Sequence, residues 1–548
     1  MKQFIVLLLA FVLVGCSGRE AAVRNLETPR LGSWGDQGDG TFRNPILNSN
    51  FPDSDVERLG DKWYMISSRG TSMKGMTILE SEDLVNWEIV GGIVDSITWK
   101  TRTGVWAGDL VHCGDYWLCY FIDFEKGLFV CKSGDIRGPW SAPHLIFERA
   151  GMTDPAVFWD EEQKQAYLLC NYQIDELGLE RVYHQRLFRL SWDGFELLDE
   201  GKDVYVGVGA EAAKIYRIND LYYIFISEWT MDGKGRKVDR RQIVLRAPMI
   251  DGPYEKRVLL ERGNGTMRSC SQGSLVQAPD GSWWYFHQLV QSSDSFEGRP
   301  QFLIPVHWED GWPLLGEDTD GNGIGNTVWQ ARKPIQGKPV RGVQTDDDFS
   351  GEELSPQWGW TGNPIAGKWS LTERRGCLRL YGMKPTNPKA PQRSVPNRVI
   401  QRKMGRAIDT MTTKMSVEAM VDGQRGGLML TGTNHAAVGV EKSRKGYRVY
   451  LDTPDGVVYS PNFEGTWVWL RTTLEQREGT ALYSLDGEHF EPIGNSFTMT
   501  TAGFNGIFIS LFSINEAERG YVDFDWFAYD YDGPKHLALD LGNNRRTN

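Results

Sequence analysis

Several common features are missing from this 548-residue chain. Long amphipathic helical patterns are absent, which weighs against an α/β barrel. The six cysteines that follow Cys16 lack the pair spacing of a zinc site, so we expect neither a metal site of that kind nor a disulfide framework. Basic residues number 60 and acidic residues 72, for a formal net charge of −12. This charge balance weighs against binding to nucleic acid or to an anionic membrane surface.

Long apolar runs are also missing, except at the N-terminus, which reads MKQFIVLLLAFVLVGCSGRE. The run is too short for a spanning helix and has the form of a signal peptide. The small residue before Cys16 resembles a bacterial lipobox. We therefore predict that residues 1–16 are a lipoprotein signal peptide and lipobox, with Cys16 lipidated; an ordinary signal peptide is the alternative. The predicted location is the cell envelope, periplasmic or outer surface, with the lipid anchor as the one membrane contact.

Aromatic residues, by contrast, are abundant and recur at a regular spacing. Five times the chain makes a tight turn and enters an aromatic strand, as in GDKWYMISS and DGSWWYFHQ. The key aromatics are Trp63, Trp117, Tyr167, Tyr222 and Trp283, separated by 54, 50, 55 and 61 residues. A period near 50 residues with about four short strands is typical of a β-propeller blade. The repeat predicts a five-bladed β-propeller over residues 40–330.

A different pattern follows a connector rich in Gly, Asn and Pro. Short alternating segments such as YRVYLDT, WVWLRTTLE and GYVDFDWFAYD are separated by turns. Such alternation indicates a β-sandwich, which we place at residues 345–535. The predicted fold class is therefore all-β, a propeller followed by a sandwich.

The repeat also predicts which side chains meet at the propeller axis, because the innermost strand of each blade begins near the central cavity. We counted back from each key aromatic. Asp53 lies 10 residues before its aromatic, Trp106, Glu211 and Gln272 lie 11 before theirs, and Asp154 lies 13 before, after a longer turn. We expect these five residues to share one register and to converge.

Three carboxylates around one cavity are costly unless they do chemistry. Like charges raise one another's pKa and can keep one carboxyl protonated at neutral pH. A carboxylic acid beside a carboxylate is what hydrolysis of a glycosidic bond requires. The structural alternatives are turn chemistry for Asp53 and Asp154 and a core position for Trp106. Asp55 fits a turn or strand-start role better than a catalytic one.

Several motifs resemble glycoside hydrolase family 43. Asn44-Pro45-Ile46, Pro52-Asp53 and the run from Arg58 to Tyr64 match its first-blade pattern, and TDPAVF, GAEAAKIYRINDLYYIF and EGRPQFLIPVHWEDGWPLL match later segments. The resemblance implies that Asp53 is the general base, Glu211 the general acid and Asp154 the residue that orients Glu211 and keeps it protonated. It also implies that Arg299, Trp106 and Gln272 contact the sugar, with Gly108 replacing a Pro of the family near Trp106. Ser271 and Gln272 stand where many members have a His that helps to hold calcium, so no cofactor is expected and a structural calcium is disfavoured.

The resemblance implies an inverting, exo-acting hydrolase that releases α-L-arabinofuranosyl or β-D-xylosyl residues from plant cell-wall glycans or oligosaccharides. Inversion requires the two reacting carboxyl groups to lie roughly 6.5–9.5 Å apart, to leave room for water. Two alternatives remain open, namely an endo-arabinanase and a non-catalytic glycan-binding lipoprotein of the cell surface.

Overall fold

The computed structural model describes residues 33–173, 182–262, 270–289, 297–500 and 503–534. Residues 1–16, including Cys16, lie outside the described residues, so the lipoprotein signal stays a prediction. No helix among the described residues is long and apolar enough to span a membrane. The described chain is almost entirely β-structure, with one short helix, α1 (Pro391–Ser394), and one 3₁₀ turn, η1 (Gly503–Asn505). This confirms the predicted all-β class.

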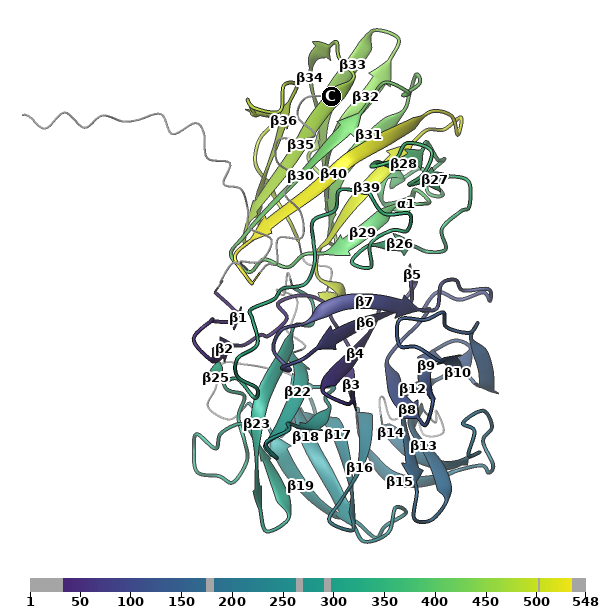
Figure 1. Ribbon diagram of the computed structural model, residues 1–548, viewed down its shortest axis with the longest axis vertical. Helices are drawn as coiled ribbons and strands as arrows, with labels where there is room; N and C mark the ends of the chain where they lie inside the picture. Colours follow the sequence, from purple (N-terminus) through teal and green to yellow (C-terminus); the bar gives the residue numbers. More distant parts are fainter. Residues whose placement is uncertain (1–32, 174–181, 263–269, 290–296, 501–502, 535–548) are drawn as a thin grey trace, which may run out of the picture.

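Five antiparallel sheets form the propeller blades (Figure 1). Blade 1 consists of β3 (Asp55–Leu59), β4 (Lys62–Ser68), β6 (Met76–Ser81) and β7 (Glu88–Ile93). Blade 2 consists of β8 (Gly108–Cys113), β9 (Tyr116–Asp123), β10 (Gly127–Ser133) and β11 (His144–Glu148). Blade 3 consists of β12 (Met152–Asp160), β13 (Gln165–Gln173), β14 (Val182–Leu190) and β15 (Lys202–Val208). Blade 4 consists of β16 (Glu211–Ile218), β17 (Leu221–Met231), β18 (Lys237–Ala247) and β19 (Glu255–Leu260). Blade 5 consists of β20 (Cys270–Ser271), β21 (Leu275–Gln277), β22 (Trp283–Leu289), β23 (Gln301–Glu309) and β24 (Trp312–Leu315).

A small sixth sheet accompanies the five blades. It consists of β1 (Gly35–Asp36), β2 (Thr41–Arg43) and β25 (Gln330–Arg332). The sheet therefore joins the start of the described chain to the connector that follows the last blade.

Buried apolar side chains fill the spaces between neighbouring blades. The five predicted key aromatics lie on the second strands, β4, β9, β13, β17 and β22, which confirms the repeat. Trp63, Trp117 and Tyr222 are at most 2% exposed. Each large apolar side chain buried in this way stabilises the fold by about 1.5–3 kcal/mol before entropy is subtracted.

Two further sheets form the C-terminal sandwich (Figure 1). The first contains β34 (Gly456–Phe463), β33 (Gly446–Thr453), β32 (His435–Ser443), β31 (Arg425–Thr431), β39 (Phe508–Ile514), β29 (Val399–Arg402), β26 (Gly359–Thr361) and β5 (Ser72–Met73). The second contains β27 (Trp369–Ser370), β28 (Leu378–Tyr381), β40 (Tyr521–Tyr531), β30 (Ile408–Ser416), β35 (Trp467–Glu475), β36 (Glu478–Ser484) and β37 (Glu491–Pro492), with β38 (Phe497–Thr498) paired to β36. Alternation along β35, whose residues are half-buried and buried in turn, is the pattern of a strand with one face on the core.

The two domains are joined by a shared sheet and a shared core. The strand β5 belongs to the propeller sequence but pairs with β26 of the sandwich, where Met73 lies opposite Trp360. One hydrophobic cluster runs without a break from blades 1 and 5 into the sandwich. The side chain of Asn48 also donates to the backbone oxygen of Met404 at 3.0 Å. The sandwich is therefore a fixed part of the propeller's upper rim, as Figure 1 shows.

Candidate active site

The candidate active site is a cavity of about 740 Å³ at the hub of the propeller. All six predicted catalytic and sugar-contacting residues line it, namely Asp53, Trp106, Asp154, Glu211, Gln272 and Arg299. The sandwich contributes Arg402, Phe504, Asn505 and Phe508 to the same lining. The five residues that were expected to converge do so, and Arg299, placed near the sugar by the resemblance, lies in the same lining.

A repeated backbone kink directs these side chains into the cavity. Asp53, Asp154 and Gln272 adopt left-handed φ values of 56°, 53° and 51° at the entrances of blades 1, 3 and 5. Left-handed backbone is unusual for residues other than glycine and clusters at functional sites. In blade 3 the kink coincides with a register shift between Thr153 and Ala156, which turns the chain locally.

The predicted common register needs a correction in blades 2 and 4. The kinked residue of blade 4 is Ala212, with φ of 59°, so Glu211 lies one position earlier than Asp53 does in blade 1. The key aromatics of blades 1, 2 and 4 each pair with the residue five positions before them. Because these three hairpins have equal lengths, the residues that lie 10 positions before each key aromatic are equivalent, namely Asp53, Ala107 and Ala212. Trp106 and Glu211 each lie one position before the equivalent residue of their blade.

Three side chains, those of Arg299, Ser68 and Gln288, form hydrogen bonds with Asp53. The guanidinium Nη1 of Arg299 and the Oγ of Ser68 each donate to a carboxylate oxygen of Asp53 at 2.7 Å. The backbone N–H of Asp53 donates to Oε1 of Gln288 at 2.8 Å. Charge-assisted hydrogen bonds of this kind are short and fix the orientation of the carboxylate. Arg299, expected to contact the sugar, lies in the cavity lining and pairs with Asp53.

Asp154 is buried beside the two other carboxylates that line the cavity. Burial, followed by the negative charges of Glu211 and Asp53, raises the pKa of Asp154 to about 7. The side chain is 8% exposed. It accepts a hydrogen bond from the backbone N–H of Ala212 at 3.2 Å and a long one from Nε2 of Gln272 at 3.4 Å. Asp154 is therefore partly protonated near neutral pH.

Glu211 has a partner that sequence reasoning missed. Its carboxylate forms an ion pair with Arg240 on β18, and the guanidinium of Arg240 lies 4.8 Å from the ring centroid of Trp229. Trp229 and Arg240 both line the cavity. The sequence signal available for Arg240 was a pair of arginines within the apolar strand VDRRQIVLRA.

Trp106 presents an aromatic wall to the cavity. Its ring stacks on Phe124 with a centroid distance of 5.1 Å, and its Nε1 donates to the backbone oxygen of Thr103 at 3.2 Å. The ring is half-buried. Because the stack and the hydrogen bond fix the plane of the indole, the ring is pre-set to contact an apolar face of a ligand.

A second group of charges lies two or three residues further along the chain than the cavity-lining residues of blades 1, 2 and 4. We call Asp53, Asp154 and Glu211 the cavity layer, and Asp55, Asp109 and Lys214 the axial layer. The ammonium of Lys214 pairs with Asp55 at 2.8 Å and also with Asp109. The other carboxylate oxygens of the axial layer accept backbone N–H groups of the next blade, from Leu110 and Val157, at 2.8 Å.

The axial layer therefore ties blade to blade, and Asp55 has a structural position, in agreement with its sequence interpretation. None of its members lines the cavity. Among the residues that the structure describes, no group of three or more His, Cys, Asp or Glu side chains is arranged to hold a metal ion.

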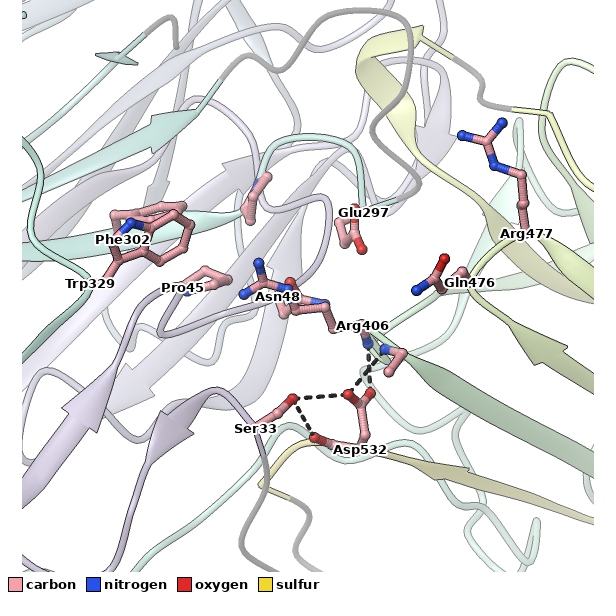
Figure 2. A pocket seen from close by; sticks show the side chains of 12 residues that line it. Ser33, Pro45, Asn48, Glu297, Phe302, Trp329, Arg406, Gln476, Arg477 and Asp532 are labelled. Carbon is pink, nitrogen blue, oxygen red and sulfur yellow. Dashed lines mark hydrogen bonds between the residues drawn. The ribbon is translucent and has the colours of Figure 1, made fainter. Parts of the chain in front are cut away.

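A further cavity, of about 530 Å³, lies between the propeller and the sandwich (Figure 2). Its lining includes Trp329, Arg406 and Asp532 but none of the cavity layer. Asp532 already accepts hydrogen bonds from Ser33 and from the backbone of Arg406, at 2.9 and 2.7 Å. We therefore assign the candidate active site to the hub cavity.

Comparisons with known proteins agree with this geometry. The family model of glycosyl hydrolases family 43 matches residues 42–313, and that of the β-xylosidase C-terminal concanavalin A-like domain matches residues 346–530. A β-xylosidase of Formosa agariphila is 42% identical to the chain, over 93% of this chain and 94% of that protein. The chain belongs to glycoside hydrolase family 43.

More distant relatives cover nearly the whole chain as well. A non-reducing end α-L-arabinofuranosidase of Bacteroides ovatus is 26% identical, over 89% of this chain and 94% of that protein. A crystal structure of a xylan β-1,4-xylosidase from Bacillus halodurans superposes with a TM-score of 0.76 at 22% identity, covering 89% of this chain and 99% of that one. This protein is thus a family 43 glycoside hydrolase with the two-domain fold.

Proposed function

We propose that this glycoside hydrolase is exo-acting and releases β-D-xylosyl or α-L-arabinofuranosyl residues with inversion of the anomeric configuration. The observation that carries the proposal is the cavity layer, three carboxylates lining one cavity, of which Asp154 has its pKa raised to about 7. The β-xylosidase relative, at 42% identity, supports the xylosyl group as the first candidate.

Each carboxylate has a distinct role in the proposed reaction. Glu211 gives its proton to the glycosidic oxygen as the bond between this oxygen and the anomeric carbon breaks. Asp53, held in place by Arg299 and Ser68, takes a proton from the water that forms the new bond on the opposite face. Asp154 positions Glu211 and holds a proton that can pass to Glu211.

The ion pair between Arg240 and Glu211 bears on this scheme. A general acid must carry a proton before it acts, so this ion pair has to open during the reaction. In the proposed scheme, sugar hydroxyl groups that enter the cavity compete for Arg240 and release Glu211 to accept the proton held near Asp154. Arg240 thus couples binding of the sugar to protonation of the acid.

The exo mode is supported by the sandwich residues in the lining. Phe504, Phe508 and Arg402 lie over one side of the cavity, whereas an endo-acting enzyme needs a cleft through which a long chain can pass. An endo-arabinanase is the second candidate within the enzyme class. Its signature would be oligosaccharide products from linear arabinan, with no release of monosaccharide.

Purified protein should be incubated with nitrophenyl β-D-xyloside and nitrophenyl α-L-arabinofuranoside, and the first-formed anomer identified by proton NMR. Release of nitrophenol from at least one compound, with inverted sugar formed first, is expected. A retained anomer would contradict the proposed mechanism. Binding of xylan or arabinan without release from either compound would favour a glycan-binding lipoprotein.

The proposed location is the cell envelope, with Cys16 lipidated and a plant cell-wall glycan as the substrate. Cys16 follows the apolar stretch and a glycine in the sequence. Replacing Cys16 with Ser should move the protein from the membrane fraction to the soluble fraction of the producing cells. An unchanged membrane fraction would contradict lipidation.

A further inference from the structure

Two arginines from different domains line the hub cavity without an acidic partner. Arg69 follows β4 of the propeller, and Arg402 ends β29 of the sandwich. Among the described residues, no carboxylate lies within 4.0 Å of either guanidinium, the limit for an ion pair, whereas Arg299 and Arg240 in the same lining are paired with Asp53 and Glu211. The two domains therefore bring two uncompensated positive charges to one cavity.

Part of each guanidinium lacks any hydrogen-bond acceptor. Arg402 donates to the backbone oxygen of Asn50 and, at 3.1 Å, to Oγ1 of Thr77, but its Nη1 is buried without an acceptor. The Nη2 of Arg69 is buried without an acceptor as well. A buried donor that makes no hydrogen bond costs about 1–3 kcal/mol, and more when it is charged.

The charges also act on each other. Burial lowers the pKa of Arg69 to about 10. Burial, and then the charge of Arg69, lower the pKa of Arg402. Both shifts mean that burial destabilises the charged side chains relative to water, and a bound anion would offset this cost.

The surroundings leave room for the guanidinium of Arg69. Gly359 of β26 lies against it, and a Cβ at this position would collide with Nη2 of Arg69. The whole cavity, at about 740 Å³, is larger than one pentose needs.

The cavity is locally basic in an acidic protein. Its lining holds six basic side chains, Arg69, Arg102, Lys237, Arg240, Arg299 and Arg402, against the three carboxylates of the cavity layer. The chain as a whole carries a formal net charge of −12. Arg102, Arg240 and Arg299 each have a carboxylate at ion-pair distance, so Arg69 and Arg402 account for much of the excess positive charge.

We propose that Arg69 and Arg402 bind a carboxylate carried by the saccharide next to the cleaved pentose, so that the substrate is a uronic acid-containing glycan. The planar fork of a guanidinium matches the two oxygens of a carboxylate. The inference rests on the proposed hydrolase function, because it names the sugar beside the one that is released.

The test compares two disaccharides that carry the same pentose in the same linkage, one on glucuronic acid and the other on glucose. The measured quantity is the ratio of kcat/KM for the uronate compound to kcat/KM for the neutral one. In the native protein this ratio should be about 10 or more, since a hydrogen bond to a charged group contributes about 1.5–3 kcal/mol. The ratio should fall toward about 1 in Arg69→Gln and should decrease with added salt.

Arg102→Gln is the matched control. Arg102 lines the same cavity, but it pairs with Glu125 at 2.6 Å, so its replacement should keep the ratio of the native protein. Should Arg69→Gln fail to fold, Arg69→Lys keeps the charge but loses the fork, and the ratio should fall at least about threefold. An unchanged ratio in a folded Arg69 variant would overturn the proposal.

Failure of this inference and failure of the proposed function give different results. A native protein that cleaves nitrophenyl pentosides but shows a ratio near 1 contradicts the arginine site and leaves the hydrolase intact. A protein that cleaves none of these compounds contradicts the proposed function. Calorimetry with glucuronate and glucose then decides on the arginine site, because only glucuronate should bind to the native protein and neither sugar to Arg69→Gln.

Discussion

The two charged layers of the hub lie close together along the chain, yet their carboxylates have different partners and different access to the cavity. In the axial layer, Lys214 neutralises two carboxylates, and backbone N–H groups occupy their remaining oxygens. In the cavity layer, two carboxylates pair with arginines, the third, Asp154, accepts hydrogen bonds from Ala212 and Gln272, and all three line the cavity. Burial raises the pKa of Asp109 in the axial layer to about 7, as it does for Asp154, so access to the cavity rather than the pKa separates the two layers. A carboxylate whose partners are all internal stabilises the fold, whereas one that shares its cavity with others is available for proton transfer.

The largest expected effect is a loss of turnover when a carboxylate of the cavity layer is replaced. Glu211→Gln should lower kcat by about 10²–10⁴-fold on xylobiose, because the departing sugar oxygen needs a proton. The loss should be much smaller on a dinitrophenyl xyloside, whose leaving group needs none. Steady-state rates on the two substrates measure this difference.

A matched control is available on β17, where Glu228 is buried and paired with Arg241 and Lys256 outside the cavity. Glu228→Gln should show the leaving-group dependence of the native protein. Equal losses on both substrates in Glu211→Gln would contradict its role as the acid.

The axial layer should respond in stability. Lys214→Met leaves Asp55 and Asp109 buried without their cation, and removal of one partner of a buried pair costs about 3–5 kcal/mol. Urea unfolding followed by fluorescence gives this free energy. Lys62→Met, which removes a half-exposed partner of Glu80, should cost less than about 1 kcal/mol. An equal loss of unfolding free energy in the two variants would show that the axial layer stabilises the fold no more than a half-exposed ion pair does.

The dependence of stability on pH should come partly from Asp154. Its pKa is about 7 in the folded protein and about 4 in an unfolded chain, so the folded state binds the extra proton between these values. The free energy of unfolding attributable to Asp154 should therefore fall as pH rises from 4 to 7. Unfolding curves of the native protein and of Asp154→Asn should diverge over this range, by a few kcal/mol in total. If the unfolding free energies of the two proteins changed in parallel with pH, the extra proton would be bound by another group and not by Asp154.

The smallest expected effect concerns the aromatic wall. Trp106→Ala removes a ring that stacks on Phe124 and faces the cavity, so KM should rise about tenfold or less while kcat changes little. Trp106→Phe keeps a flat apolar face and should restore most of the affinity. A fall in kcat with an unchanged KM would instead show that Trp106 helps to position the reacting groups rather than to bind the sugar.

Sequence periodicity predicted the blades, the sandwich and the convergence of five residues, because each blade enters the hub in a similar way. For Trp106 and Glu211 the count was one position off the kinked residue, but both still line the cavity. The residues that contact them could not be predicted by counting from the key aromatics. Arg240 lies on a third strand, and Arg402 comes from the other domain, so neither has a fixed distance from a key aromatic. The axial role of Lys214 was also missed, since a lysine in an apolar strand does not reveal which carboxylates it meets.

The central claim is that neighbouring carboxylates on one segment have separate duties, and Asp53→Asn and Asp55→Asn test it most directly. Turnover per folded molecule and the free energy of unfolding should be measured for both variants. We expect Asp53→Asn to lose nearly all turnover at close to native stability, and Asp55→Asn to lose stability while its folded fraction still turns over substrate. Near-native turnover in Asp53→Asn, or abolished turnover in fully stable Asp55→Asn, would contradict the account.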